Sequence, residues 1–209
     1  MTTPATAFPV LESGDHLSRA EFHRLYCARR DIKKAELVEG VVYVASPRRF
    51  DLHAEPHAVI ITWLGSYRAR NPGLRLGDNA TVLLDANNEV QPDACLWREE
   101  PSGPRLVDHY IEGAPQLVVE VAASSASYDL HTKLQAYQRN GVREYVVWRV
   151  LDHMIDWFRL REGEYVWVEP DEDGIIESDV FPGLCLDVPK LLVDDLQGVL
   201  SEMERRARP

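Results

Sequence analysis

Two carboxylates near the middle of the chain carry the clearest chemical signal. Glu120 stands inside the nearly continuous apolar run 117–121, where an ionised carboxylate costs several kcal/mol unless it is paired, protonated or bound to a cation. Asp93 directly follows Pro92 at the start of a second run with strand character. If the two runs are neighbouring strands, both carboxylates meet at one edge and offer the hard oxygen ligands that Mg²⁺ prefers. The alternatives are a buried ion pair for Glu120 and a turn cap for Asp93.

Lys133 is the cation best placed to join them. It lies four residues after Asp129 on a predicted helix and borders the apolar face of Leu130, Leu134 and Tyr137. Helical geometry then directs its stem toward the sheet, where partial burial would lower its pKa. A lysine in that position can orient or deprotonate a water, or stabilise charge developing on a phosphate. The alternative is a lysine that extends past apolar neighbours into solvent.

Two histidines suggest a different metal. His53 and His57 are four residues apart on a predicted helix, a spacing that can hold zinc, but no HExxH pattern and no obvious third ligand accompany them. A zinc hydrolase is therefore one alternative function. His57 can instead contact a phosphate near Asp93, or be an ordinary helix histidine. The sequence has no glycine-rich phosphate loop, no GxSxG pattern and no cysteine-nucleophile signature.

Periodicity and capping signals predict the elements that position these residues. Ser18 and Glu21 form a capping box for a first helix, and the segment 36–46 is typical of a hairpin that turns at Glu39. Asp51 can cap a second helix that ends before the turn 71–73. Further strands are expected at 82–84, 92–97, 117–121, 144–150, 154–160 and 165–168, and further helices at 129–140 and about 189–206.

Composition limits the class of protein. The chain has 209 residues, of which 45% are apolar and 27% charged, as in an ordinary globular domain. Its three cysteines form no CxxC pair, which favours a reducing, cytoplasmic setting over a disulfide framework or zinc ribbon. No segment has the length and apolarity of a signal peptide core or a membrane span. We expect a flexible tail over 1–15 and a single α+β domain over 16–209.

The net charge of −11 has the wrong sign for a protein that coats nucleic acid, but its distribution matters. The segment 152–195 contains thirteen acids and three bases, so most of the acidic excess lies in the C-terminal part. Six bases flank the predicted hairpin, and they indicate either a DNA-facing rim or an ordinary solvated helix end and loop. They are Arg29, Arg30, Lys33, Lys34, Arg48 and Arg49.

An ordered set of motifs resembles a known family. From about residue 18 to 192 the chain resembles the Uma-type family of putative restriction endonucleases, within the PD-(D/E)XK nuclease superfamily. The motifs are Glu39-Gly40, His57, Pro92-Asp93, the stretch 115–121, Asp129, Lys133, Tyr137, the stretch 141–145 and the late stretch 181–184. The resemblance implies a restriction-endonuclease-like core, with a mixed central β-sheet flanked by helices, and a divalent-metal site for phosphodiester hydrolysis.

Roles carried over by position follow from the resemblance. Asp93 and Glu120 would hold Mg²⁺ or Mn²⁺, Lys133 would be the motif lysine displaced onto the helix, and Glu39 would be the auxiliary acid of the hairpin. Two features depart from the pattern. The usual lysine two positions after the glutamate is absent, because Ala122 stands there, and the family's serine-proline-serine is replaced by 123–125, Ala-Ser-Ser.

The function that we expect is metal-dependent DNA endonuclease activity. Asp93 and Glu120 would hold the metal, Lys133 would orient the attacking water or offset developing charge, and Glu39 would tune the metal shell. The main alternative is a nuclease fold that no longer cuts and serves as a DNA- or protein-binding module. A homodimer is also expected, because symmetric dimers are common and two sites help to cut both strands.

Overall fold

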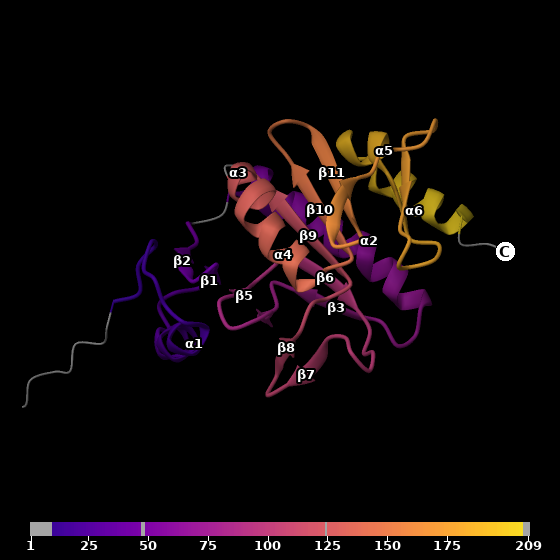
Figure 1. Ribbon diagram of the computed structural model, residues 1–209. Coiled ribbons are helices and arrows are strands. Elements are labelled where there is room, and N and C mark those ends of the chain that lie inside the picture. Colours follow the sequence, from indigo (N-terminus) through magenta and orange to yellow (C-terminus); the bar gives the residue numbers. More distant parts are fainter. Residues whose placement is uncertain (1–9, 47–48, 124, 207–209) are drawn as a thin grey trace, which may run out of the picture.

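A six-stranded mixed sheet forms the centre of the fold in the computed structural model, which describes residues 10–46, 49–123 and 125–206 (Figure 1). Strands β9 and β10 run parallel, and the other neighbours in this sheet are antiparallel. The predicted α+β fold with a mixed central sheet is thus confirmed. In spatial order the strands are β12 (Glu164–Trp167), β11 (Met154–Arg161), β10 (Glu144–Arg149), β9 (Leu117–Ala122), β6 (Ala94–Trp97) and β3 (Arg75–Asp78).

The crossover between β9 and β10 is helical and carries Lys133. It consists of α3 (Ala126–Tyr128), the π-helical turn η2 (Asp129–Lys133) and α4 (Leu134–Asn140). The crossover ends where Gly141 adopts a left-handed conformation with φ 81°, as glycine does readily after a helix. The predicted strand–helix–strand unit is present, but Asp129 lies inside the helical segment and does not cap it.

Helices cover both faces of the sheet because the β9 side chains alternate between two apolar clusters. Val119 and Val121 belong to the cluster on one face, whereas Val118 and Ala122 belong to the cluster that contains Tyr137 of α4. Glu120 therefore faces α4. The first face is covered by α2 (Glu55–Arg70), α5 (Val188–Leu192), α6 (Leu196–Arg206) and the small sheet of β13 (Ile175–Glu177) and β14 (Cys185–Asp187), and the turn η1 (Phe50–Ala54) precedes α2.

A second six-stranded sheet lies beside the first, at the end of the molecule that contains α1 (Arg19–Ala28) (Figure 1). The expected capping box of α1 is present between Ser18 and Glu21. Phe22 of α1 packs with Leu11 against the hairpin. The strands in spatial order are β2 (Val41–Val44), β1 (Ala35–Val38), β5 (Glu89–Val90), β4 (Val82–Leu83), β8 (Tyr110–Glu112) and β7 (Arg105–Val107).

Three local predictions differ from the structure. The second helix begins as the π-helical turn at Phe50, so Asp51 lies in its first turn and is not its cap. The expected helix 189–206 is two helices, because the Asp195 carboxylate accepts the Gly198 N–H and starts a new one. Of the expected tail, residues 1–9 lie outside the described residues, whereas Leu11 is buried.

None of the helices in the described part of the chain is long and apolar enough to cross a membrane.

Candidate active site

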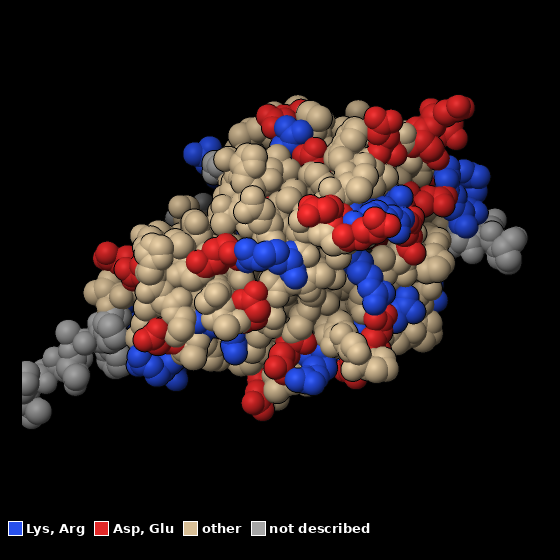
Figure 2. Space-filling model, viewed as in Figure 1, with Lys and Arg blue, Asp and Glu red and all other residues tan. Residues whose placement is uncertain are grey.

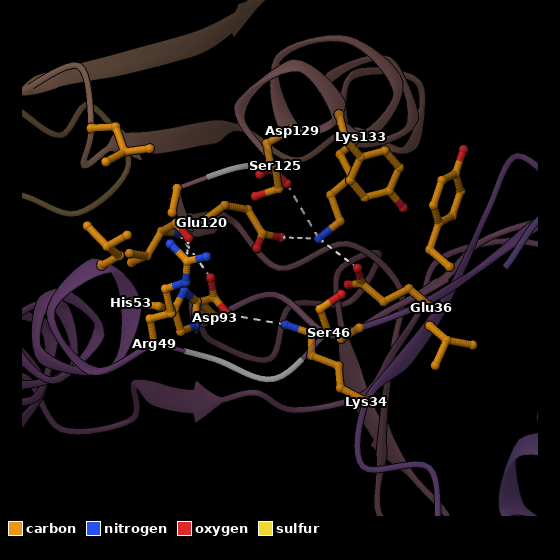
Figure 3. A pocket seen from close by; sticks show the side chains of 18 residues that line it. Lys34, Glu36, Ser46, Arg49, His53, Asp93, Glu120, Ser125, Asp129 and Lys133 are labelled. Carbon is orange, nitrogen blue, oxygen red and sulfur yellow. Dashed lines mark hydrogen bonds and ion pairs between the residues drawn. The ribbon is translucent and has the colours of Figure 1, made fainter.

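Strand pairing brings Asp93 and Glu120 together. Strands β6 and β9 are antiparallel neighbours in which Ala94 pairs with Val119, so one further step places Asp93 opposite Glu120. Opposite residues of an antiparallel pair project from the same face. Both side chains are buried, at 3% exposure each, and both line a pocket of about 620 Å³ (Figure 3). The predicted convergence of the two carboxylates at one edge is therefore present.

Asp93 is held ionised by its surroundings. Its Oδ1 lies 3.1 Å from Lys34 Nζ, and its Oδ2 accepts the Val121 backbone N–H at 3.0 Å. Burial would raise the pKa of Asp93, but His53, Lys34 and the Val121 N–H outweigh it and lower the pKa below the ordinary range. Asp93 thus carries a negative charge into the pocket.

Lys133 is shared by three buried carboxylates. Its Nζ lies 2.8 Å from Glu120 Oε1, 3.0 Å from Glu36 Oε2 and 3.8 Å from Asp129 Oδ1 (Figure 3). The Tyr137 hydroxyl donates to the same Glu120 oxygen at 3.0 Å. One ammonium cannot offset three buried carboxylates, so a proton or a further cation must balance the remaining charge.

The pKa values of this cluster follow from that imbalance. Burial is the main reason that the pKa of Glu120 rises to about 8; Lys133 opposes the rise, and Asp93 adds to it. Burial raises the pKa of Asp129 as well. Burial would lower the pKa of Lys133, but the surrounding carboxylates, Glu120 first, raise it well above its usual value. The lysine was expected to have a lowered pKa, and the direction is the opposite.

Two π-helical turns border the pocket. Turn η2 supplies Asp129 and Lys133, and turn η1 supplies His53. Short π-helical segments are uncommon and often occur at functional sites. In η2 the wider turn keeps Asp129 and Lys133, four residues apart, on the pocket side, where both are buried. The sequence predicted the helix and its lysine but not this local geometry.

Glu39, the acid expected to assist the metal site, lies outside the pocket, and Glu36 lies in it. Glu39 lies in the β1–β2 turn with φ 55°, where its carboxylate binds Asn88 and Arg139 and does not line the pocket. Glu36 of β1 occupies the pocket and contacts Lys133. The signal that could have identified Glu36 is the one used for Glu120, a carboxylate within an apolar strand that is buried throughout.

The two histidines do not form a zinc pair. Their rings stack with centroids 5.8 Å apart, but each uses a nitrogen on a backbone carbonyl. His57 Nε2 donates to the Asp93 carbonyl at 2.8 Å, and His53 Nδ1 donates to the Val121 carbonyl at 3.0 Å. Within the described residues, no three carboxylate, imidazole or thiolate groups form a ready-made metal cluster.

Comparison with known proteins gives the family. The Uma2 family, described as "Putative restriction endonuclease", matches residues 19–189. The chain belongs to the Uma2 family. The crystal structure of a putative nuclease belonging to DUF820 from Anabaena variabilis ATCC 29413 shares the fold, with TM-score 0.60 and 14% identity over 76% of this chain and 89% of that chain. The type IIG restriction endonuclease BpuSI gives TM-score 0.40 and 15% identity over 79% of this chain and 18% of its own. No curated protein matches the chain.

The atoms around Asp93 can serve as ligands of the divalent cation that the family implies. Because a carbonyl only accepts, His53 Nδ1 carries the hydrogen toward Val121, and a neutral ring then turns a lone pair on Nε2 toward the pocket. This Nε2 is buried without a hydrogen-bond partner, 3.5 Å from Asp93 Oδ1. A protonated ring places an N–H toward Asp93 and lowers the pKa of that carboxyl, whereas with a neutral ring a metal cation can take the place of this proton between Nε2 and Oδ1.

The predicted DNA-facing bases have different environments. Lys34 and Arg49 line the pocket, Arg29 pairs with Asp31 at 2.7 Å, Arg30 and Lys33 are exposed, and Arg48 lies outside the described residues. Figure 2 shows Lys and Arg interspersed with Asp and Glu over the face in view. The segment 152–195 lies mainly at the end opposite α1 and the β1–β2 hairpin (Figure 1).

Proposed function

We propose that this chain is a divalent-metal-dependent endonuclease that hydrolyses phosphodiester bonds in DNA. The observation that carries the proposal is the placement of Asp93 and Glu120 opposite each other on neighbouring strands, with Lys133 in the same pocket. Membership of the Uma2 family supports the reaction class. Carboxylates can hold the metal ion for such hydrolysis, and a lysine can stabilise the charge that develops on the phosphate.

Asp93 and Glu120 would hold Mg²⁺ or Mn²⁺, which polarises a phosphoryl oxygen and lowers the pKa of an attacking water when bound. Asp93 brings an ionised carboxylate, because its pKa is lowered. Glu120 brings a carboxylate whose raised pKa lets it exchange a proton for a cation near neutral pH. The buried His53 Nε2 offers an additional nitrogen at the same place.

Lys133 acts in this proposal as a cation rather than as a base. Its raised pKa keeps it protonated at neutral pH, so it donates hydrogen bonds and stabilises negative charge that develops on the phosphate. It approaches Glu120 from the crossover helix and so supplies the charge that the superfamily's usual lysine, absent at Ala122, would supply from the strand. Glu36 and Asp129 keep Lys133 in position.

Lys34 and Arg49 would receive the substrate backbone, because both line the pocket and carry positive charge. Arg29, Arg30 and Lys33 would extend the rim, and His57 would stabilise the loop that presents Asp93.

The test uses supercoiled plasmid with Mg²⁺ or Mn²⁺, with and without chelator. Wild-type protein should nick or linearise it in a metal-dependent way, whereas Glu120→Gln and Asp93→Asn should lose most of this activity. The melting temperature should rise with Mn²⁺ in wild type and much less in Asp93→Asn. Cleavage by both variants at the rate of the wild type would contradict the proposed site. Arg205→Gln, in α6, is the matched surface control.

A second candidate function is DNA binding without cleavage. It is favoured by one observation, that an ammonium group already contacts each carboxylate, Lys34 on Asp93 and Lys133 on Glu120. DNA retention in a mobility-shift assay, with neither cleavage nor a Mn²⁺-induced change in melting temperature, would select this function over the endonuclease.

A further inference from the structure

A second, smaller pocket lies between α1, β5 and β8. It encloses about 190 Å³ and shares no lining residue with the candidate active site. Its walls include His23 and Cys27, one helical turn apart on α1, together with Glu89 and Tyr110. Cys27 is exposed, whereas the other cysteines, Cys95 and Cys185, are buried. An exposed thiol beside a histidine has the two features on which thiol reactivity depends, access and a nearby base.

A buried carboxylate orients His23. The two oxygens of Glu89 lie 2.9 and 3.1 Å from His23 Nδ1, and the Glu89 side chain is only 1% exposed. Burial raises the pKa of Glu89 and His23 opposes the rise. Because both carboxylate oxygens lie within hydrogen-bond distance of Nδ1, the carboxylate is the acceptor, so Nδ1 carries the hydrogen and Nε2 of the neutral ring carries the lone pair. The Tyr110 ring packs edge-on against the imidazole, with centroids 4.9 Å apart and planes at 83°. His23 therefore has a fixed orientation and a defined tautomer.

The lone pair of His23 faces the thiol. Cys27 Sγ lies 3.6 Å from Nε2, within reach of an S–H···N hydrogen bond. The Tyr110 hydroxyl lies 3.7 Å from the same sulfur. When the Cys27 thiol donates its hydrogen to His23, the Tyr110 hydroxyl can donate to the sulfur. After the proton has moved to His23, the thiolate accepts hydrogen bonds from both His23 Nε2 and the Tyr110 hydroxyl. Nucleophile, base and orienting acid thus stand in the order found in Cys–His catalytic groups.

We propose that Cys27 is a reactive thiol, activated by His23 and Glu89, that forms a mixed disulfide with low-molecular-weight disulfides. His23 Nε2 takes the thiol proton, and the Cys27 sulfur attacks one sulfur of the disulfide. The S–S bond of the reagent breaks as the new S–S bond forms, and the leaving thiolate receives the proton from His23. One RS group of the reagent becomes disulfide-bonded to Cys27 and the other half leaves as one free thiol, so the step needs no other oxidant.

The other cysteines provide an internal contrast. Burial raises the pKa of Cys95 to about 12 and that of Cys185 to about 11. Neither has the thiolate character or the access that disulfide exchange requires. In the native protein, Cys27 should therefore react well before the other two.

The test is the rate of reaction of the native, metal-free protein with 5,5′-dithiobis(2-nitrobenzoic acid), followed by the absorbance of the released thiol. One fast equivalent is expected, and it should disappear in Cys27→Ser. An ordinary thiol is only a few per cent ionised at pH 7, so His23→Gln should slow the fast phase roughly 10-fold or more. Tyr110→Phe should slow it less. His131→Gln, an exposed histidine on η2, is the matched control and should react as wild type does.

The pH profile separates activation from simple exposure. Wild-type reactivity should persist below pH 8, whereas in His23→Gln it should fall steadily as pH falls. The charged and titratable groups around the pair are His23, Tyr26 and Arg29 from α1 and its end, Arg19 at the start of α1, Glu89 from β5 and Tyr110 from β8.

Mass spectrometry with glutathione disulfide should show one adduct on the peptide that contains Cys27. An unchanged rate and profile in His23→Gln would overturn the proposal, as would a fast phase that remains in Cys27→Ser.

Discussion

Lys34 and Asp93 form an ion pair across the candidate active site, with Nζ 3.1 Å from Oδ1. Lys34 precedes β1 of the second sheet, and Asp93 precedes β6 of the central sheet, so the pair links the two sheets where the pocket lies. A divalent cation that binds Asp93 has to displace this ammonium or share the carboxylate with it. The pair therefore connects the stability of the metal-free protein with its affinity for metal.

Replacing Lys34 by methionine should make the Mn²⁺-induced rise in melting temperature larger, because the competing charge on Asp93 is removed. Without metal, the variant should be less stable, by an amount on the order of 3 kcal/mol, because a buried carboxylate loses an ionic partner. Calorimetry with and without Mn²⁺ measures both effects. Lys33→Met, next to it and exposed, is the control and should change neither. A smaller Mn²⁺ response in Lys34→Met would mean that the lysine supports the metal.

Glu120 should give the metal-free protein a recognisable pH dependence. Its pKa is about 8 in the folded state against an ordinary value of 4.5, so the folded protein keeps a proton that the unfolded chain releases. The contribution of Glu120 to stability is therefore fully present below about pH 4.5 and is lost as the pH rises toward 8, by up to about 1.4 kcal/mol per pH unit. Urea unfolding in chelator should show wild type losing stability relative to Glu120→Gln between pH 5 and 8. A constant difference would contradict this assignment.

Lys133→Met should reduce cleavage by on the order of 10²-fold or more, because a charge beside the reacting phosphate is lost. It should also destabilise the protein at pH 7.5 by about 3–5 kcal/mol, since the three carboxylates around it lose their shared cation. At pH 5 the loss should be smaller, because the carboxylates then take up protons. Urea unfolding at both pH values and a plasmid assay separate the two effects, and cleavage at the wild-type rate would show that the lysine is structural.

Glu36 and Glu39 offer a direct comparison of two acids in one hairpin. Glu36→Gln removes a carboxylate that contacts Lys133 and accepts the Gln91 N–H at 2.7 Å, so cleavage should fall at least roughly 10-fold. Glu39→Gln changes a turn residue outside the pocket that binds Arg139 and Asn88, so cleavage should stay within about 2-fold of wild type. The reverse ranking in a plasmid assay would restore Glu39 as the auxiliary acid.

Binding of duplex DNA should depend on Arg49 more than on Arg205. Reversing Arg49 to glutamate places a negative charge at the pocket, so affinity should fall for any sequence, and the log–log salt slope should flatten by about 0.9 because one phosphate is no longer neutralised. Arg205→Glu, in a helix at the opposite end, should have little effect. Fluorescence anisotropy at two or more salt concentrations, in a Glu120→Gln background, gives both slopes. Equal reductions in affinity would place the binding face elsewhere.

The positions of Asp93, Glu120 and Lys133 could be predicted because each follows from a local rule. A carboxylate inside an apolar strand needs compensation, and a lysine on the crossover helix can reach it. The family pattern indicated Glu39, and the sequence could not show that β1 of the second sheet lies against the crossover helix, so Glu36 was missed. Both acids belong to the same hairpin, but Glu36 lies on β1 and contacts Lys133, whereas Glu39 lies in the turn.

The sequence also could not predict that the pKa of Lys133 is raised. Burial alone lowers the pKa of a lysine, and the direction is reversed only because Glu36, Glu120 and Asp129 converge on one Nζ. Glu36 comes from β1, which is far in the sequence from Glu120 on β9 and Asp129 on η2. The surroundings of Cys27 could be predicted only in part. Its pairing with His23 is local, but Glu89, the acid that orients His23, lies 66 residues further along the chain.

Within the crossover, the π-helical turn η2 carries the residues that face the pocket, whereas α4 carries those that pack on the sheet. Such a turn amounts to an α-helix with one residue inserted, and removing one residue would restore regular winding. Deleting the exposed His131 should therefore leave Tyr137 and α4 packed on the sheet while Asp129 rotates away from Lys133. An insertion of this kind lets evolution adjust the residues that face the pocket without rebuilding the core beneath them.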